Sequence, residues 1–206
     1  MQAKPESCSS CPLALKGRGW VPPTGPRTSP VLFLGEAPGS DEATVSEPFV
    51  GAAGALFQRA LYKLDKDKKD YRTHNCISCQ PPGNWLEGSP WEYAAISHCA
   101  GNLDSVLAEG HSVVVPLGNV ALRRVLNLPQ GKGFGVKDFH GTVTRDPSNR
   151  FWVVPTFHPS HIQRGAFNLF GTFLFDLAKA FEVAEHGWTQ DVPELICDPS
   201  IDIWEQ

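Results

Sequence analysis

One stretch, residues 31–39, constrains the fold of this chain more than any other. Residues 31–34 (Val-Leu-Phe-Leu) form a short apolar run after a proline, which is typical of a buried β-strand. The next five residues, Gly35-Glu36-Ala37-Pro38-Gly39, predict a sharp turn that places a carboxylate directly after the strand. In open α/β sheets, ligands bind just beyond the carboxyl ends of the strands. This turn is therefore the first candidate for a functional site.

Predicted strands and helices alternate along the rest of the chain. Residues 71–78 (YRTHNCIS) look like a second strand with Asn75 near its end, and short apolar runs predict further strands at 112–117 and 151–155. Apolar residues at helical spacing predict helices at 52–64, 91–108, 120–126 and 166–186. This alternation indicates an α/β fold with a mostly parallel sheet covered on both faces. We expect one domain, residues 1–186, followed by an acidic extension, residues 187–206.

Composition leaves the class of partner open. The net charge is −4, but residues 187–206 hold five acids and no Lys or Arg, so the remainder is nearly neutral. A local basic groove can bind phosphates on a protein of any net charge. We find no apolar run long enough to span a membrane, and the start lacks the apolar core of a signal peptide. We therefore expect a cytoplasmic monomer without a membrane partner, whose six cysteines are metal ligands or free thiols.

Polar residues follow three of the predicted strands: Glu36, Asn75 and His158. Because parallel strands open on the same edge of a sheet, we expect these side chains to face one crevice. Phe49 can line it, since Pro48 restrains the chain just before it. An aromatic ring can stack on a flat heterocycle, and an amide offers the edge of a base both a donor and an acceptor.

The residues around His158 complete this pattern. The imidazole can donate to an oxygen that gains negative charge as a bond breaks. Pro159, Ser160 and Arg164 can grip phosphates through a backbone amide, a hydroxyl and a cation. An enzyme that acts on a flipped-out base needs these groups, because its target is unreachable inside the duplex.

At these residues the sequence resembles the uracil-DNA glycosylase superfamily, and most closely its family four, the iron–sulfur type. The resemblance covers about residues 8–182 and rests on four motifs: Gly35-Glu36-Ala37-Pro38-Gly39, Pro48-Phe49-Val50-Gly51-x2-Gly54, Cys79-Gln80-Pro81-Pro82-Gly83-Asn84, and His158-Pro159-Ser160 with Arg164. It implies a three-layer α/β/α fold with a central four-stranded, mostly parallel sheet. It also implies hydrolysis of the N-glycosidic bond of a base flipped out of DNA, with uracil as the default base.

The resemblance further implies roles for individual residues. His158 would stabilise the departing base anion and Glu36 would position water, with Asp41 as a substitute. The motif has Ala37 where the best-known uracil glycosylases place an aspartate, so no general base is obvious. The implied base-binding residues are Gly35, Ala37, Phe49, Asn75 and His74, and the implied DNA-binding residues are Pro82, Gly83, Asn84, Pro159, Ser160 and Arg164.

The cysteines allow two metal centres. Spacing alone favours a four-thiolate zinc site made of Cys8-x2-Cys11 and Cys76-x2-Cys79. The family resemblance instead implies a [4Fe–4S] cluster held by Cys8, Cys11, Cys79 and Cys99, and we expect the cluster. Cys76, which follows Asn75 on a predicted strand, would then be a small buried apolar group. Either metal would pin residues 1–30 and play a structural part.

The chain departs from the family's usual pattern at several positions. His74 stands where the family usually has Thr, and Ala43 and Glu47 replace an acidic and a basic residue. The interval from Cys79 to Cys99 is longer than usual and carries Trp85 and Trp91. A reshaped pocket that accepts a bulkier base, such as a modified cytosine in viral DNA with a role in antiviral defence, is one alternative. A non-catalytic, metal-stabilised DNA-binding module is the other.

Overall fold

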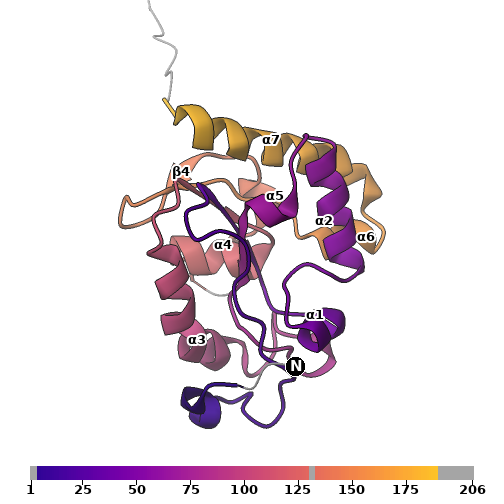
Figure 1. Cartoon of the computed structure of the whole chain (residues 1–206), viewed down its shortest axis with the longest axis vertical. Coiled ribbons are helices and arrows are strands. Elements are labelled where there is room, and N and C mark those ends of the chain that lie inside the picture. Colours follow the sequence, from indigo (N-terminus) through magenta and orange to yellow (C-terminus); the bar gives the residue numbers. More distant parts are fainter. Residues whose placement is uncertain (1–3, 130–132, 190–206) are drawn as a thin grey trace, which may run out of the picture.

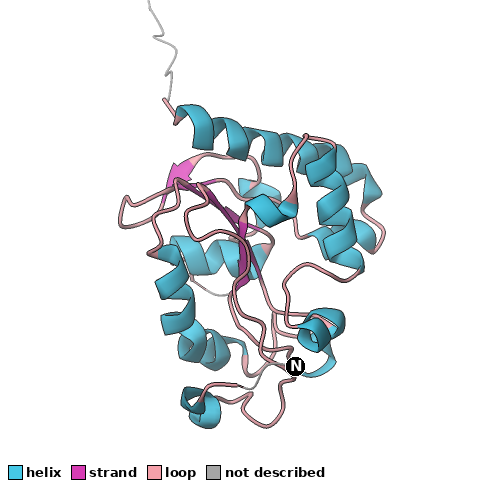
Figure 2. Cartoon of the chain, in the orientation of Figure 1, coloured by secondary structure: helices cyan, strands magenta, loops and turns pink. Residues whose placement is uncertain are grey.

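A five-stranded sheet organises the described residues, 4–129 and 133–189, of this computed structural model. The strand order is β2-β1-β3-β5-β4, and the four strands β2, β1, β3 and β5 are parallel. Figure 2 shows the strands at the centre of the molecule with helices on either side. The strands are β1 (Val31–Gly35), β2 (Arg72–Asn75), β3 (Val113–Pro116), β4 (Thr144–Arg145) and β5 (Trp152–Val153).

One strand of the sheet, β4, was not predicted. It has two residues and pairs antiparallel with β5, so the sheet is mostly parallel but has one strand more than the expected four. Arg145 lies opposite Trp152, and its guanidinium sits 3.6 Å from the centre of the indole ring. A cation–π pair thus holds this edge strand, and a strand so short leaves no apolar run in the sequence.

Helices cover both faces of the sheet, which confirms the three-layer α/β/α fold (Figure 1). On one face, Leu32 and Leu34 pack with α3 and α4, and on the other Val31 and Phe33 pack with α2, α6 and α7. β1 is fully buried because both its faces are covered, which explains its continuous apolar run. The longer helices are α2 (Ala52–Tyr62), α3 (Glu92–Leu107), α4 (Asn119–Leu126) and α7 (Phe170–His186).

Short helices fill the connections, and apart from η4, which lies within the predicted helix 166–186, none of them was predicted. The short α-helices are α1 (Ser40–Val45), α5 (Val136–Phe139) and α6 (Pro159–Gln163), and the 3-10 turns are η1 (Glu6–Ser10), η2 (Lys68–Asp70), η3 (Pro82–Asn84) and η4 (Phe167–Leu169). α1 follows the turn after β1, and α6 begins directly after His158 with a proline at its first position. Both helices therefore start at the carboxyl edge of the sheet.

The N-terminal segment docks beside β2 through backbone hydrogen bonds. Thr24 bridges to Thr73, Arg18 bridges to Gln80, and the Val21 N–H donates to the Ser78 carbonyl at 2.7 Å. These bonds hold the segment along the loop that follows β2. Within the described ranges, no helix is long and apolar enough to cross a membrane. Most of the predicted acidic extension, residues 190–206, lies outside the described residues.

Candidate active site

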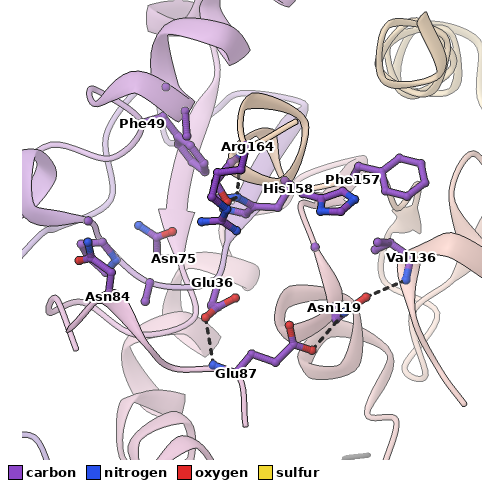
Figure 3. A pocket seen from close by; sticks show the side chains of 18 of the residues that line it. Glu36, Phe49, Asn75, Asn84, Glu87, Asn119, Val136, Phe157, His158 and Arg164 are labelled. Carbon is purple, nitrogen blue, oxygen red and sulfur yellow. Dashed lines mark hydrogen bonds between the residues drawn. The ribbon is translucent and has the colours of Figure 1, made fainter. Parts of the chain in front are cut away.

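A cavity of about 880 Å³ opens at the carboxyl edge of the parallel strands. Glu36 follows β1, Asn75 ends β2 and His158 follows β5, and all three side chains line this cavity together with Phe49 (Figure 3). The structure thus brings together the strand-end residues that the sequence predicted to converge. The other predicted residues in the lining are Ala37, Asp41, Asn84, Ser160 and Arg164.

Gly35 lies behind the cavity wall. A methyl group on its Cα would stand 2.2 Å from Asn75 Oδ1 and 2.9 Å from Phe49 Cζ, distances that no real side chain tolerates. The glycine therefore leaves the space that these two side chains occupy. Gly35 does not line the cavity itself, but it sets where Phe49 and Asn75 can lie.

Asn75 offers a buried hydrogen-bond donor without an acceptor. Its residue surface is 3% exposed, and its Nδ2 finds no hydrogen-bond partner among the described residues. An unpaired buried amide costs free energy, so this group is suited to a ligand that brings an acceptor. The amide is the strongest sign that the cavity recognises a polar ring.

His74 does not join this group. It precedes Asn75 on β2, where successive side chains point to opposite faces, and it does not line the cavity. Burial, with a smaller contribution from Arg72, lowers the pKa of His74 to about 4, so the ring is neutral at pH 7. Pro82, Gly83 and Pro159 also lie outside the lining, although each adjoins a residue within it.

A carboxylate that the sequence reasoning missed fixes Phe49. Glu42, on α1, accepts the Gly39 N–H at 2.6 Å and the Phe49 N–H at 2.5 Å, and so ties the two ends of the loop together. Phe49 has a φ of 56°, a left-handed backbone that a bulky residue adopts only when its surroundings enforce it. A Glu three residues after the residue that precedes a helix is a helix-start signature, and it could have revealed the bond between Glu42 and the Gly39 N–H.

Glu36 is partly buried at the base of the cavity. Its Oε1 accepts the Glu87 N–H at 3.1 Å. Burial raises the pKa of Glu36, the Glu87 N–H lowers it, and the carboxylates of Glu87 and Glu92 raise it again against the opposing charge of Arg123. A carboxylate with a raised pKa is well suited to accept a proton near neutral pH.

Glu87 links the long loop after β2 to α4. Its Oε1 accepts from Asn119 Nδ2 at 3.1 Å (Figure 3). The same oxygen accepts from Arg123 Nη2 at 2.9 Å. Asn119 in turn accepts the Val136 N–H at 3.0 Å. These residues lie far apart in the sequence and carry no shared motif, so nothing in the sequence pointed to them.

His158 is held as a neutral donor. The Ser160 N–H donates to its Nδ1 at 3.2 Å, and Ser160 Oγ lies 2.8 Å from the same nitrogen. Because Nδ1 accepts, the neutral ring carries its proton on Nε2. Burial, aided by Arg164 and His161, lowers the pKa of His158 to about 4. At pH 7 the ring is therefore an uncharged Nε2–H donor at the cavity wall.

Comparisons with known proteins agree with this geometry. The profile of the Uracil DNA glycosylase superfamily matches residues 22–181. A type-4 uracil-DNA glycosylase of Thermotoga maritima is 32% identical over 85% of this chain and 88% of its own length. Type-4 uracil-DNA glycosylases of Archaeoglobus fulgidus and Pyrobaculum aerophilum are 36% and 28% identical, over 59% and 85% of this chain and 60% and 89% of their own lengths.

The chain belongs to the uracil DNA glycosylase superfamily. It is therefore a DNA glycosylase, a hydrolase of N-glycosyl bonds, with DNA as its substrate. The cavity of this glycosylase contains the predicted residues Glu36, Phe49, Asn75 and His158.

Four of this glycosylase's cysteines gather at the end of the molecule that holds the N-terminal segment. Cys8, Cys11, Cys79 and Cys99 are buried. Each of the other three contributes to raising the pKa of Cys79. Burial is the largest cause that raises the pKa of Cys79 to about 12, so a free thiol here stays protonated at pH 7. Cys76 is also buried, and among the other cysteines Cys99 has the largest effect on it.

The donor set fits a thiolate-bound cluster in kind and number, since Cys8, Cys11, Cys79 and Cys99 are four buried thiols. Across residues 4–129 and 133–189, no three His, Cys, Asp or Glu side chains already stand at the separations that would hold one metal ion.

Proposed function

We propose that this glycosylase removes uracil from DNA and leaves an abasic site. The observation that carries the proposal is the buried, unpaired Nδ2 of Asn75, which lies beside Phe49 in the cavity wall. A carbonyl of the base would accept from this amide while the ring stacks on Phe49. A site built to pair with a polar edge discriminates strongly against bases that leave its groups unpaired.

In this mechanism the bond between the sugar C1′ and the base nitrogen breaks, and its electron pair stays with the base. The Nε2–H of His158 donates to the base oxygen on which the negative charge collects. The sugar becomes oxocarbenium-like, and a water molecule attacks C1′. Glu36 accepts a proton from that water, because burial raises its pKa, and Asp41 is excluded from this role because its side chain is exposed. Arg164, Ser160 and Asn84 would contact the DNA around the extruded nucleotide.

We further propose that Cys8, Cys11, Cys79 and Cys99 hold a [4Fe–4S] cluster. Two observations support this ligand set: all four cysteines are buried, and the cysteines with the largest electrostatic effect on Cys79 are Cys99, Cys11 and Cys8 rather than Cys76. The second observation disfavours the zinc site that spacing suggested. The cluster would be structural when bound, and the reaction is carried out by the side chains of the cavity.

The size of the cavity supports a second candidate, a bulkier or modified base such as a modified cytosine. Beyond His158 the lining continues over Phe157, Phe134 and Val136, so the cavity does not end at the predicted base site (Figure 3). This apolar continuation could take a substituent on the ring.

A release assay decides between these functions. Matched oligonucleotides carry uracil, hypoxanthine or a modified cytosine at one position, and abasic sites are detected by strand cleavage in alkali. We expect release of uracil and its loss in Asn75→Ala, with Tyr62→Ala as a surface control. Release of only a modified cytosine would replace uracil by the second candidate. Binding without release from any substrate would indicate a non-catalytic DNA-binding module.

A further inference from the structure

An exposed indole, Trp85, stands at the rim of the cavity. Trp85 is 51% exposed and does not itself line the cavity, but its neighbours Asn84 and Glu87 do. It belongs to the long loop between Cys79 and Cys99, and neither the family match nor the proposed mechanism gives it a part.

The indole is held in place although it is exposed. Its Nε1–H donates to the Glu87 carbonyl at 2.9 Å. The Trp91 ring meets it edge to face, with centroids 5.7 Å apart and planes at 70°, and Trp91 Nε1 donates back to the Trp85 carbonyl at 3.2 Å. A large aromatic surface that is already ordered loses little entropy when it binds a flat partner.

Cations lie beside the indole pair. Lys16 Nζ is 5.9 Å from the centre of the Trp91 ring, and both Lys16 and Arg18 are exposed. Arg18 bridges to Gln80, whose Nε2 donates to Asn84 Oδ1 at 2.7 Å. The N-terminal segment thus places Lys16 beside the Trp91 ring and pairs Arg18 with the loop that carries Trp85.

We propose that Trp85 stacks on a nucleobase of the bound DNA outside the cavity, while Lys16 and Arg18 contact the adjoining phosphates. An aromatic platform flanked by cations is how proteins hold unpaired bases without reading their sequence. The stacked base would be one that neighbours the extruded nucleotide, because Trp85 is next to residues that line the cavity. This inference rests on the proposed function, which places DNA at this rim.

The test measures binding to oligonucleotides that contain a stable abasic analogue, both single-stranded and in a duplex. Trp85→Ala should weaken binding about tenfold, within the range of base–aromatic stacking. Trp85→Phe should bind nearly as well as the wild type, whereas Trp85→Leu, which keeps apolar bulk but has no ring, should resemble Trp85→Ala. Equal binding by the Leu variant and the wild type would overturn stacking.

The salt dependence of DNA binding distinguishes the contribution of the Trp85 ring from that of the cations. Lys16→Gln should reduce the slope of log affinity against log salt by about 0.7 to 0.9, while Trp85→Ala should leave this slope unchanged. Comparing single-stranded with duplex oligonucleotides identifies the base that stacks on Trp85. If Trp85→Ala loses affinity only for single strands, the stacked base is an unpaired one. If it loses affinity only for the duplex, the stacked base is one that adjoins the extruded nucleotide.

Tyr62→Ala is the matched control, because Tyr62 is an exposed aromatic, 64% accessible, that does not line the cavity. If Trp85→Ala and Tyr62→Ala bind equally well while the wild type releases uracil, the inference fails and the proposed function stands. If the wild type neither binds these oligonucleotides nor releases any base, both fail together.

Discussion

In the proposed mechanism the reaction depends most on Glu36, because Ala37 cannot act as a base. Its carboxylate is fixed by the Glu87 N–H, and burial keeps its pKa above that of an exposed glutamate. We predict that Glu36→Gln lowers the single-turnover rate of base release by about 10²- to 10⁴-fold, the usual contribution of a positioned base.

The matched control is Asp41→Asn, since Asp41 lines the same cavity but is exposed. Asp41→Asn should change the rate little. An unchanged rate in Glu36→Gln, together with a large loss in Asp41→Asn, would exchange the two roles.

Glu87 should tune Glu36 through its charge. The Glu87 carboxylate raises the pKa of Glu36, so removing that charge lowers this pKa. In the proposed mechanism Glu36 is active as the carboxylate, so the rate of base release should rise with pH as Glu36 loses its proton. We predict that Glu87→Gln shifts this rise toward lower pH, as measured by single-turnover rates across the acidic range.

His158 does not interfere with this measurement above pH 5, because its pKa of about 4 keeps it neutral there. A rise at the same pH in Glu87→Gln and the wild type would show that the Glu87 charge does not reach Glu36. A fall in maximal rate without a shift would instead point to a displaced loop.

Among the elements, two helical glycines have opposite surroundings. In α2, a Cβ on Gly54 would lie 2.1 Å from the backbone carbonyl of Phe49, whereas one on Gly101 in α3 meets no described atom within 4 Å. We predict that Gly54→Ala destabilises the protein by about 1–3 kcal/mol or more, as overpacking does, and lowers activity by displacing Phe49.

Gly101→Ala should stabilise it by about 0.5–1 kcal/mol, because alanine favours a helix interior. Denaturant unfolding of both variants checks these signs. Equal effects would mean that the contact between α2 and Phe49 does not govern stability.

How far the sequence predicts each element depends on what its residues show locally. The apolar run of β1 and the apolar residues of α2 and α3 can be recognised from each element's own sequence. These elements were therefore predicted within a few residues. β4 was missed because an Arg–Trp contact, rather than an apolar run, holds it. Glu87 was missed because its partners on α4 become its neighbours only in the fold.

At the scale of the whole molecule, the four proposed ligands join parts that are distant along the chain. Cys8 lies in η1 with Cys11 just after it, Cys79 follows β2, and Cys99 lies in α3. A cluster on these residues would close long loops between the N-terminal segment and the sheet, and closing a loop stabilises a fold by restricting the unfolded chain.

The same segment carries Lys16 and Arg18, so we predict that loss of the cluster also lowers the affinity for DNA. Cys79→Ala should abolish visible absorbance and bound iron, lower the thermal midpoint and weaken DNA binding together. Cys76→Ala is the matched control: Cys76 is equally buried but outside the ligand set, so this variant should stay coloured and bind DNA. A colourless wild type that contains zinc, with Cys76→Ala losing the metal, would assign the site to the paired Cys-x2-Cys motifs instead.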